Sequence, residues 1–451
     1  MSLDVTYRVQ IPHRAGQLAA VASMIAQHQG LIGDVVTVNL GREATIREIT
    51  VEVADTGAAW DLATDLNKLP GVNVLWHHDR AFIRHDGGKL HITARHPVTT
   101  VQEMRDIYTP GVARICTAIA ENPNLAGRYT MIGQTVAIVT NGSRVLGLGD
   151  IGPVAAMPVM EGKAVFYDQC VGLSAMPILL DAHDPDTFVE TVMRIAPTFG
   201  AIHLEDISAP ECFEIEARLI EALPQPVMHD DVHGTAVVTL AAAIAGCRQV
   251  DRRLDQSVLG QLGLGAAGFG IATLVKQGGA ERVLAFDPNE DMHARAREQG
   301  IEIASMDEVL AQSDVVVATT GRAGLIKPEM VRPGQVILAL TNPVPEIYPD
   351  DALAAGAAFA ADGSAVNNVL GYPGIFRGAL MAGASRITTE MKLAAAWALA
   401  GLTIESELVP DPLDRSVHAA VAEAVRVTAV QAGLGDPERV PPALAPSSAP
   451  S

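Results

Sequence analysis

Residues 258–278, with the sequence VLGQLGLGAAGFGIATLVKQG, decide the fold of the larger part of this chain. An apolar strand pattern runs into Gly263-x-Gly265-x-x-Gly268, where a helical pattern begins. The first glycine permits a tight turn, the second lets the backbone approach a pyrophosphate, and the third lets helix and strand pack closely. Ala266 and Ala267 start the helix, whose free amide groups favour phosphate. The alternative is a glycine-rich turn in an ordinary strand–helix–strand unit.

The strand that follows, RVLAFD, ends at Asp287, 22 residues after Gly265. A carboxylate here can accept hydrogen bonds from the adenosine ribose hydroxyls and would repel a 2′-phosphate. The sequence therefore predicts a site for NAD rather than NADP. From about residue 251 to 385, strand patterns (SVLGQLG, RVLAFD, DVVVAT and QVILALT) alternate with helical ones. This alternation predicts a Rossmann-type, doubly wound parallel sheet within an α/β protein.

Composition limits the remaining possibilities. The 451 residues include 32 Lys and Arg against 52 Asp and Glu, so the net charge is −20. This length predicts two to four domains of roughly 100–200 residues. The acidic balance argues against binding to nucleic acid, which needs clustered positive charge. A hydrophobic content of 49% argues against wholesale disorder.

The N-terminus, the longest apolar runs and the cysteine spacing all favour a reduced compartment. The N-terminus lacks the apolar segment of a signal peptide, and no run reaches the roughly 18 apolar residues of a membrane span. The four cysteines lie far apart with no CxxC spacing. We therefore expect a cytoplasmic protein with no membrane partner and no thiolate metal site.

The first 85 residues are expected to form a separate unit. Strand and helix patterns follow the order β-α-β-β-α-β, which is that of the ferredoxin-like fold. The segment IPHRAGQLAAVASMIAQHQGLI, with Gly16 and Gly30, resembles the loop, first helix and glycine turn of an ACT domain. The resemblance implies a regulatory module that binds an amino-acid effector. The alternative is a dimerising α/β module without a ligand.

Three further segments complete the predicted organisation. Residues 86–250 are expected to form a mixed helix and strand domain, in which TVAIVT-NG-SRVLG is a hairpin candidate with a turn at Asn141-Gly142. Residues 251–430 are expected to form the dinucleotide-binding domain with C-terminal helices. Residues 431–451, rich in Pro, Ser and Ala, are expected to be a disordered tail.

Two short apolar strands end in pairs of acidic residues. GAIHLEDI contains Glu205-Asp206, and PVMHDDVHGTA contains Asp230-Asp231. One helical segment joins them, so we expect parallel neighbours whose carboxyl ends share an edge of the sheet. Crowded carboxylates are costly without a cation, which predicts Mg²⁺ or Mn²⁺. The alternatives are that Asp206 or Asp231 caps a helix, or that zinc binds with a nearby histidine.

Seven ordered blocks resemble the bacterial malic enzymes over residues 96 to 430. They are YTPGVA (108–113), GSRVLGLGDIGP (142–153), MPVMEGKAV (157–165), LEDI (204–207), HDDVHGTA (229–236), TNPVPEI (341–347) and NNVLGYPGIFRGAL (367–380). The resemblance implies a malic-enzyme-like catalytic domain joined to the Rossmann-type domain. It also implies oxidative decarboxylation of (S)-malate to pyruvate and CO₂, with reduction of NAD and a divalent metal.

Catalytic and metal residues follow from the same resemblance. Tyr108 corresponds to the acid that protonates the enolpyruvate carbon, and Lys163 to the base that takes the C2 hydroxyl proton. Glu205, Asp206 and Asp231 correspond to the metal ligands. To act as a base near neutral pH, Lys163 would need a lowered pKa. Burial and a nearby dication would both lower it.

Substrate and cofactor contacts are also implied. Arg144 corresponds to the residue that grips the malate carboxylate, since a guanidinium matches a planar carboxylate. Asn342, Asn367 and Asn368 correspond to substrate and nicotinamide contacts. We keep Asp230 outside the ligand set, as a residue behind the metal or facing the substrate.

Each of these residues has an ordinary alternative role. Tyr108 could pack a turn, Lys163 could be a solvated surface residue, Arg144 could pair with Asp150, and Asn342 before a proline could form a turn. The occurrence of all seven blocks in one chain favours the catalytic interpretation.

Two rival functions stay open. A malolactic or oxaloacetate-decarboxylating relative would use the same metal and base, and NADH production from malate separates it from a malic enzyme. A catalytically dead amino-acid sensor would not need to keep the complete catalytic set. The resemblance also implies a homodimer or homotetramer.

Overall fold

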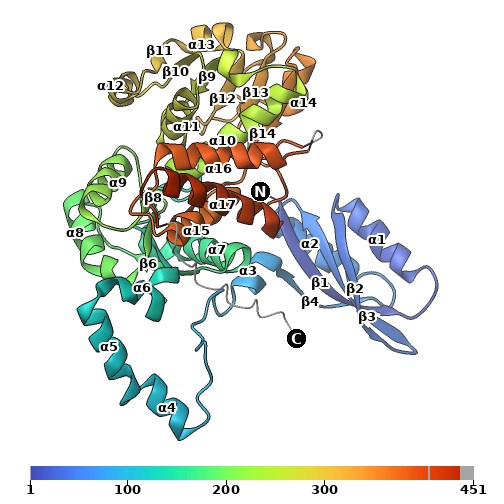
Figure 1. Cartoon of the computed structure of the whole chain (residues 1–451). Coiled ribbons are helices and arrows are strands. Elements are labelled where there is room, and N and C mark those ends of the chain that lie inside the picture. The colour runs from blue at the N-terminus through green and yellow to red at the C-terminus, as the bar shows by residue number, and fades with distance from the viewer. Residues whose placement is uncertain (1, 405–406, 437–451) are drawn as a thin grey trace. The chain divides into compact units, whose positions relative to one another are not determined.

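The computed structural model describes residues 2–404 and 407–436 (Figure 1). The chain forms two compact units, Met1–His91 and Ile92–Ser451. The first unit was expected to end at residue 85, where α3 (Arg80–His85) ends, and α3 packs against strands β1 and β4 of the same unit. Most of the expected tail, residues 437–451, lies outside the described residues.

The first unit has the predicted order of strands and helices. It contains β1 (Leu3–Pro12), α1 (Gln17–Gln27), β2 (Leu31–Leu40), β3 (Ala44–Val53), α2 (Thr56–Leu66) and β4 (Asn73–Asp79). The strands form one antiparallel sheet in the order β2-β3-β1-β4. Alternate residues of β1, from Val5 to Ile11, are buried with Val21 and Ile25 of α1, as period-two patterning requires. The ferredoxin-like order is thus confirmed.

The second unit begins with a parallel sheet of four strands. These are β5 (Thr135–Thr140), β6 (Ser174–Leu179), β7 (Ala201–Leu204) and β8 (Val227–His229), in the order β6-β5-β7-β8. Helices α7 (Pro153–Val171), α8 (Pro185–Ile195) and α9 (Glu211–Ala222) make the crossovers. The prediction that β7 and β8 are parallel neighbours joined by one helix is confirmed. Their carboxyl ends therefore bring the acidic pairs to one edge.

The hairpin predicted after β5 is wrong. β5 pairs only in parallel, with β6 and β7, and the expected second arm SRVLG (143–147) forms no strand, only a single bridge between Val145 and Gly149. Gly142 has φ 68°, and a Cβ there would lie 2.2 Å from the Gly152 carbonyl oxygen. The glycine therefore serves a close crossing between the end of β5 and the start of α7, which the Asn-Gly pair alone does not reveal.

The second sheet has the predicted doubly wound topology. Six parallel strands lie in the order β11-β10-β9-β12-β13-β14, which places the change of strand order between β9 and β12. They are β9 (Val258–Leu262), β10 (Arg282–Phe286), β11 (Glu302–Ile303), β12 (Val315–Ala318), β13 (Val336–Ala339) and β14 (Phe359–Asp362). Helices α11 (Ala266–Gln277), α12 (Asp291–Glu298), α13 (Met306–Gln312) and α14 (Pro349–Ala354) connect them. The edge strands β11 and β14 were not predicted, because β11 has only two residues and β14 (FAAD) lacks the β-branched residues that mark β12 and β13.

A group of helices completes the second unit. α10 (Asp230–Gln249) packs against α11 and α16 (Thr389–Leu402), and α15 (Tyr372–Ala382) packs against α17 (Arg415–Gln431). α10 is buried almost throughout, since its small residues allow close packing. In the described part of the chain no helix is both long and apolar enough to cross a bilayer.

Two short helices project from the rest of this unit. α4 (Val101–Ile107) and α5 (Gly111–Glu121) lie in the lower part of Figure 1. Most of their residues are exposed, including several large apolar ones: Val101, Met104, Ile107, Tyr108, Val112 and Ile115. A projecting pair of helices with exposed apolar side chains is typical of a surface that another chain covers.

Candidate active site

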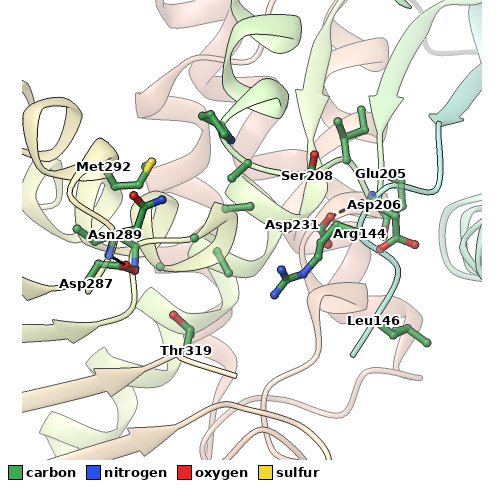
Figure 2. A pocket seen from close by; sticks show the side chains of 18 of the residues that line it. Arg144, Leu146, Glu205, Asp206, Ser208, Asp231, Asp287, Asn289, Met292 and Thr319 are labelled. Carbon is green, nitrogen blue, oxygen red and sulfur yellow. Dashed lines mark hydrogen bonds between the residues drawn. The ribbon is translucent and has the colours of Figure 1, made fainter. Parts of the chain in front are cut away.

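A cavity of about 450 Å³ contains most of the expected site residues. One end holds Glu205, Asp206 and Asp231 with Arg144 beside them, and Asp287 lies at the other end (Figure 2). The expected site residues that line it are Arg144, Lys163, Glu205, Asp206, Asp231, Gly265, Ala266, Ala267, Gly268, Asp287 and Asn368. The cavity therefore joins the acidic strand ends to the glycine turn.

Three acidic side chains converge at the first end. Glu205 and Asp206 follow β7, and Asp231 stands in the first turn of α10, directly after β8. One carboxylate oxygen of each lies within 4.8 Å of the others. Asp206 has φ 54°, and its amide donates to Asp231 Oδ2 at 3.1 Å. A non-glycine residue in the left-handed region carries backbone strain, which is common where side chains must point into a functional site.

The electrostatics of this cluster call for a cation. Burial, reinforced by the neighbouring acids, raises the pKa of Glu205 to about 8 and that of Asp206 to about 9. Asp206 Oδ2 is buried and has no hydrogen-bond partner among the described residues. A hard divalent cation with oxygen ligands would satisfy this atom and lower both pKa values. The donor set therefore fits Mg²⁺ or Mn²⁺.

Lys163 lies next to the acids and is held by two of them. Its Nζ is 2.5 Å from Asp230 Oδ2 and 2.9 Å from Glu205 Oε1, and it stands 4.7 Å from the ring centre of Tyr372. Burial acts to lower the pKa of Lys163, but the charges of Asp230 and Glu205 outweigh it and hold this pKa well above its usual value. The lowered pKa that a base requires is expected for the site with a dication bound, where the charges that hold the ammonium would be neutralised, and it stays a prediction.

Asp230 is the site residue that the sequence left without a definite place. It is fully buried and pairs with Lys163, and its carboxylate groups with Glu205 and His203 rather than with Asp206 and Asp231. His203 and Tyr167 were missed altogether, since a histidine inside a strand and a tyrosine inside a helix are usually core residues. Only their position next to Glu205 reveals them.

Arg144 is available for an anion. Within the described residues it forms no ion pair, and Asp150, its expected alternative partner, instead accepts a hydrogen bond from the Gly152 amide. Its backbone amide donates to the Asp206 carbonyl, which fixes the loop after β5 to the loop after β7. Figure 2 shows the guanidinium pointing into the cavity beside the acids.

The second end of the cavity has the features of a dinucleotide-binding turn. Gly263 has φ 89°, and a Cβ at Gly268 would lie 2.0 Å from the Gly263 carbonyl oxygen. A Cβ at Gly265 would meet no atom within 4 Å, so the space beside it is open. Gly265 also begins α11 without a side-chain cap, which leaves helix amides free for a pyrophosphate.

Asp287 lies beside this turn, as predicted. Its Oδ2 accepts from the Leu264 amide at 2.5 Å and its Oδ1 from the Asn289 amide at 2.7 Å. Asn289 and Met292 also line the cavity, and no spacing rule in the sequence marked them. The carboxylate is therefore fixed at the end of β10, where a ribose would lie.

Four expected residues do not line the cavity. Gly263 is buried in the turn, and Asn342 is exposed. The side chain of Asn367 accepts from the Val369 amide and caps a short 3₁₀-helix. Tyr108 is 70% exposed at the end of α4. No motif indicated that Tyr108 would lie outside the cavity that Lys163 lines, because both residues belong to motifs of one family.

Together, the two parallel sheets and the shared cavity define a class: a nicotinamide-dependent dehydrogenase that acts on a small anionic substrate. Two family descriptions match the chain, "Malic enzyme, N-terminal domain" at residues 87–220 and "D-isomer specific 2-hydroxyacid dehydrogenase, NAD binding domain" at residues 241–323. The chain belongs to the malic enzyme family.

Individual relatives cover nearly all or most of the chain. The NAD-dependent malic enzyme 1 of Bacillus subtilis is 48% identical, over 95% of this chain and 98% of the relative. The bifunctional malic/malolactic enzyme of the same organism is 41% identical, over 78% of this chain and 93% of the relative. The crystal structure of malic enzyme from Pyrococcus horikoshii superposes with a TM-score of 0.73 at 36% identity, covering 84% of this chain and 92% of that chain.

Proposed function

We propose that this protein oxidatively decarboxylates (S)-malate to pyruvate and CO₂, with reduction of NAD⁺ and with a divalent metal. One observation carries the proposal: Lys163 and three convergent acids share a cavity with the Gly265–Gly268 turn. A hydroxy acid bound at the acids would therefore face a nicotinamide ring extending from the turn. Relatives named as NAD-dependent malic enzymes support the same reaction.

The bound groups supply two kinds of chemistry. Mg²⁺ or Mn²⁺, which Glu205, Asp206 and Asp231 would hold, would supply positive charge to stabilise a negatively charged oxygen at C2. NAD⁺, which the Gly265–Gly268 turn would hold, would supply the acceptor for the C2 hydride. Arg144 binds a carboxylate of malate through paired N–H groups and so orients C2.

Side chains of the protein carry out the proton transfers. Lys163 Nζ takes the C2 hydroxyl proton, which requires a neutral amine, and neutralisation of Glu205 by the cation weakens the charge that holds the ammonium. Asp230 keeps Nζ in place through its 2.5 Å contact. Loss of CO₂ from the C4 carboxylate leaves an enolate, and Tyr108 donates the proton that C3 needs.

Tyr108 reaches this step from a second copy of the chain. The phenol is 70% exposed and is not among the residues that line the cavity of its own chain. It lies on the projecting helices α4 and α5, whose exposed apolar side chains need a partner. A homodimer, or a homotetramer built from such pairs, would bury these side chains and complete the site.

Cofactor preference is assigned to Asp287. Its fixed carboxylate at the end of β10 suits the ribose hydroxyls of NAD and repels a 2′-phosphate. Asn342, Asn367 and Asn368 are proposed to contact substrate or nicotinamide, and of these Asn368 already lines the cavity.

The first unit is proposed to be an ACT-type regulatory domain for an amino-acid effector. A cavity of about 270 Å³ lies between the end of β1 and the start of α1, and its lining includes Arg14, Arg47 and His13. The helix begins at Gly16 without a side-chain cap and has no acidic residue in its first turn. Two guanidinium groups near free helix amides suit a carboxylate. This role is tested by screening amino acids as effectors of malate oxidation. The screen is repeated with Arg14→Ala and Arg47→Ala, which remove the proposed carboxylate-binding groups.

A malolactic reaction is the second candidate, since a relative is named as a bifunctional malic/malolactic enzyme. It would use the same metal and lysine but release lactate. The deciding experiment is a malate-dependent assay with NAD and NADP side by side, with and without Mn²⁺. NADH and pyruvate as products support our proposal, whereas lactate without net NADH contradicts it.

The four free cysteines are compatible with the proposed cytoplasmic location.

A further inference from the structure

A buried chain of side chains lies behind Glu205. Tyr167 from α7 and His203 from β7 are both fully buried. The Tyr167 hydroxyl is 2.9 Å from His203 Nδ1, and His203 Nε2 is 2.6 Å from Glu205 Oε2. The other oxygen, Glu205 Oε1, lies 2.9 Å from Lys163 Nζ. The two carboxylate oxygens of Glu205 thus face opposite ways, one toward the core and one toward the cavity.

The direction of each hydrogen bond follows from the groups themselves. Glu205 is ionised when it ligates a cation and then only accepts, so His203 Nε2–H donates to Glu205 Oε2. A neutral imidazole protonated at Nε2 has its lone pair at Nδ1, and the Tyr167 hydroxyl can then donate to it. Tyr167 therefore selects the tautomer of His203 that can hold Glu205.

Packing fixes the orientation of the imidazole. His203 stacks on Phe376 with ring centres 5.5 Å apart and 12° between the planes. Tyr372 meets the same ring edge-on at 5.3 Å. Rotation of the imidazole away from Glu205 would require these aromatic rings to move, so the bond to Oε2 is preserved.

We propose that Tyr167 and His203 are positioning residues that hold Glu205 ready for the divalent cation. Because His203 occupies Oε2, Oε1 is the oxygen left to face the cavity and Lys163. The inference rests on the proposed metal site. Hydrogen-bonded partners of ligand carboxylates commonly change metal affinity by 10–100-fold when removed.

The competing interpretation makes His203 itself a metal ligand. His203, Glu205 and Asp230 also offer ligand atoms within 4.8 Å of one another. However, both ring nitrogens of His203 already have partners, whereas Asp206 Oδ2 in the other cluster has none. The geometry therefore favours the oxygen cluster for the ion.

The experiment measures Mn²⁺ binding to the full chain by electron paramagnetic resonance, without malate or NAD. Tyr167→Phe removes only the hydroxyl, and we expect the Mn²⁺ Kd to rise by about tenfold while NADH binding is unchanged. His203→Leu should raise it at least as much. His203→Gln retains a donor and an acceptor and should recover most of the affinity. Tyr348→Phe, at a half-exposed site, is the control and should change nothing.

Three outcomes separate the possibilities. Unchanged Mn²⁺ affinity in Tyr167→Phe and His203→Leu overturns the inference and leaves the metal site intact. A directly coordinated imidazole nitrogen in the pulsed spectrum of the wild type also overturns it, since His203 would be a ligand. Equal Mn²⁺ binding by the wild type and Asp231→Asn would remove the proposed metal site itself and, with it, this inference.

Discussion

Gly270 of α11 lies directly against the Val232 carbonyl of α10, where a Cβ on the glycine would stand 2.0 Å from that oxygen. Val232 is the residue after Asp231, and Gly270 is two residues after Gly268 of the dinucleotide turn. The contact of these two helices thus sets the separation between the acids and the cofactor turn. Hydride transfer requires such a fixed separation, since a displacement of about 1 Å between reacting groups can cost roughly 10²-fold in rate.

Gly270→Ala should push the two helices apart. Overpacking of this kind costs about 1–3 kcal/mol of stability, and we expect a lower melting temperature together with a lower kcat. Gly401→Ala is the matched control, because its added Cβ meets no atom within 4 Å on an exposed face of α16. Differential scanning calorimetry and steady-state kinetics make the comparison. Wild-type kcat in a destabilised Gly270→Ala would show that this contact does not set the reacting distance.

Lys163→Ala should abolish malate oxidation while leaving Mn²⁺ binding intact. Loss of a general base costs roughly 10²–10⁴-fold in rate. Removal of the ammonium also removes a cation that competes with the metal for Glu205, so Mn²⁺ affinity should be equal or greater. Lys327→Ala, at an exposed position, serves as the control. Turnover near that of the wild type would rule out Lys163 as the base.

Sequence patterns were sufficient for the elements that have strong periodicity or fixed spacing. The βαββαβ order, the doubly wound parallel sheet, and the convergence of Glu205, Asp206 and Asp231 all followed from alternation, glycine spacing and strand-end acids. These features depend on local geometry, which sequence encodes directly.

Other features depend on tertiary contacts and could not be predicted in this way. Asn141-Gly142 has the composition of a hairpin turn, but its glycine is required by contact with Gly152. His203 has the sequence context of a core residue, and its bond to Glu205 exists only in the folded protein. The raised pKa of Lys163 likewise depends on Asp230, 67 residues away.

Metal affinity and metal-free stability should depend on pH in opposite ways. The pKa values of Glu205 and Asp206 are raised to about 8 and about 9, against roughly 4 in an unfolded chain. The folded metal-free protein therefore binds more protons than the unfolded chain between about pH 4 and 9. The contribution of these groups to stability is present at low pH and is lost as pH rises through this window.

Thermal unfolding in the presence of a chelator should accordingly show a melting temperature that falls between about pH 6 and 9. Saturating Mn²⁺ should abolish this fall, because it replaces the bound protons. Mn²⁺ affinity should rise by about tenfold per pH unit for each proton released below pH 8. Asp206→Asn removes one of the titrating groups and should flatten both profiles. An Mn²⁺ affinity that does not change with pH would contradict the cluster as the binding site.

Asp287→Asn should shift preference from NAD toward NADP. The amide oxygen can still accept from the Leu264 amide, and only the weaker turn contact from the Asn289 amide is lost together with the charge that repels a 2′-phosphate. We expect the ratio of kcat/KM for NAD to that for NADP to fall by at least about tenfold, as for loss of a charged hydrogen bond. Asp287→Ala removes the acceptor as well and should impair both cofactors. An unchanged ratio in Asp287→Asn would leave cofactor choice unexplained by this residue.

Mixed oligomers of Tyr108→Phe and Lys163→Ala test whether the site is completed by a second chain. Each variant alone should be inactive, because every site lacks either the acid or the base. If Tyr108 acts in the partner's site, half of a randomly mixed dimer population is heterodimeric, and each heterodimer has one intact site and one doubly defective site. The mixture should then recover roughly a quarter of the wild-type activity. Native mass spectrometry verifies that heterodimers form. If they form and activity is still absent, Tyr108 does not serve the partner's site, and α4 and α5 must bring it to Lys163 within one chain.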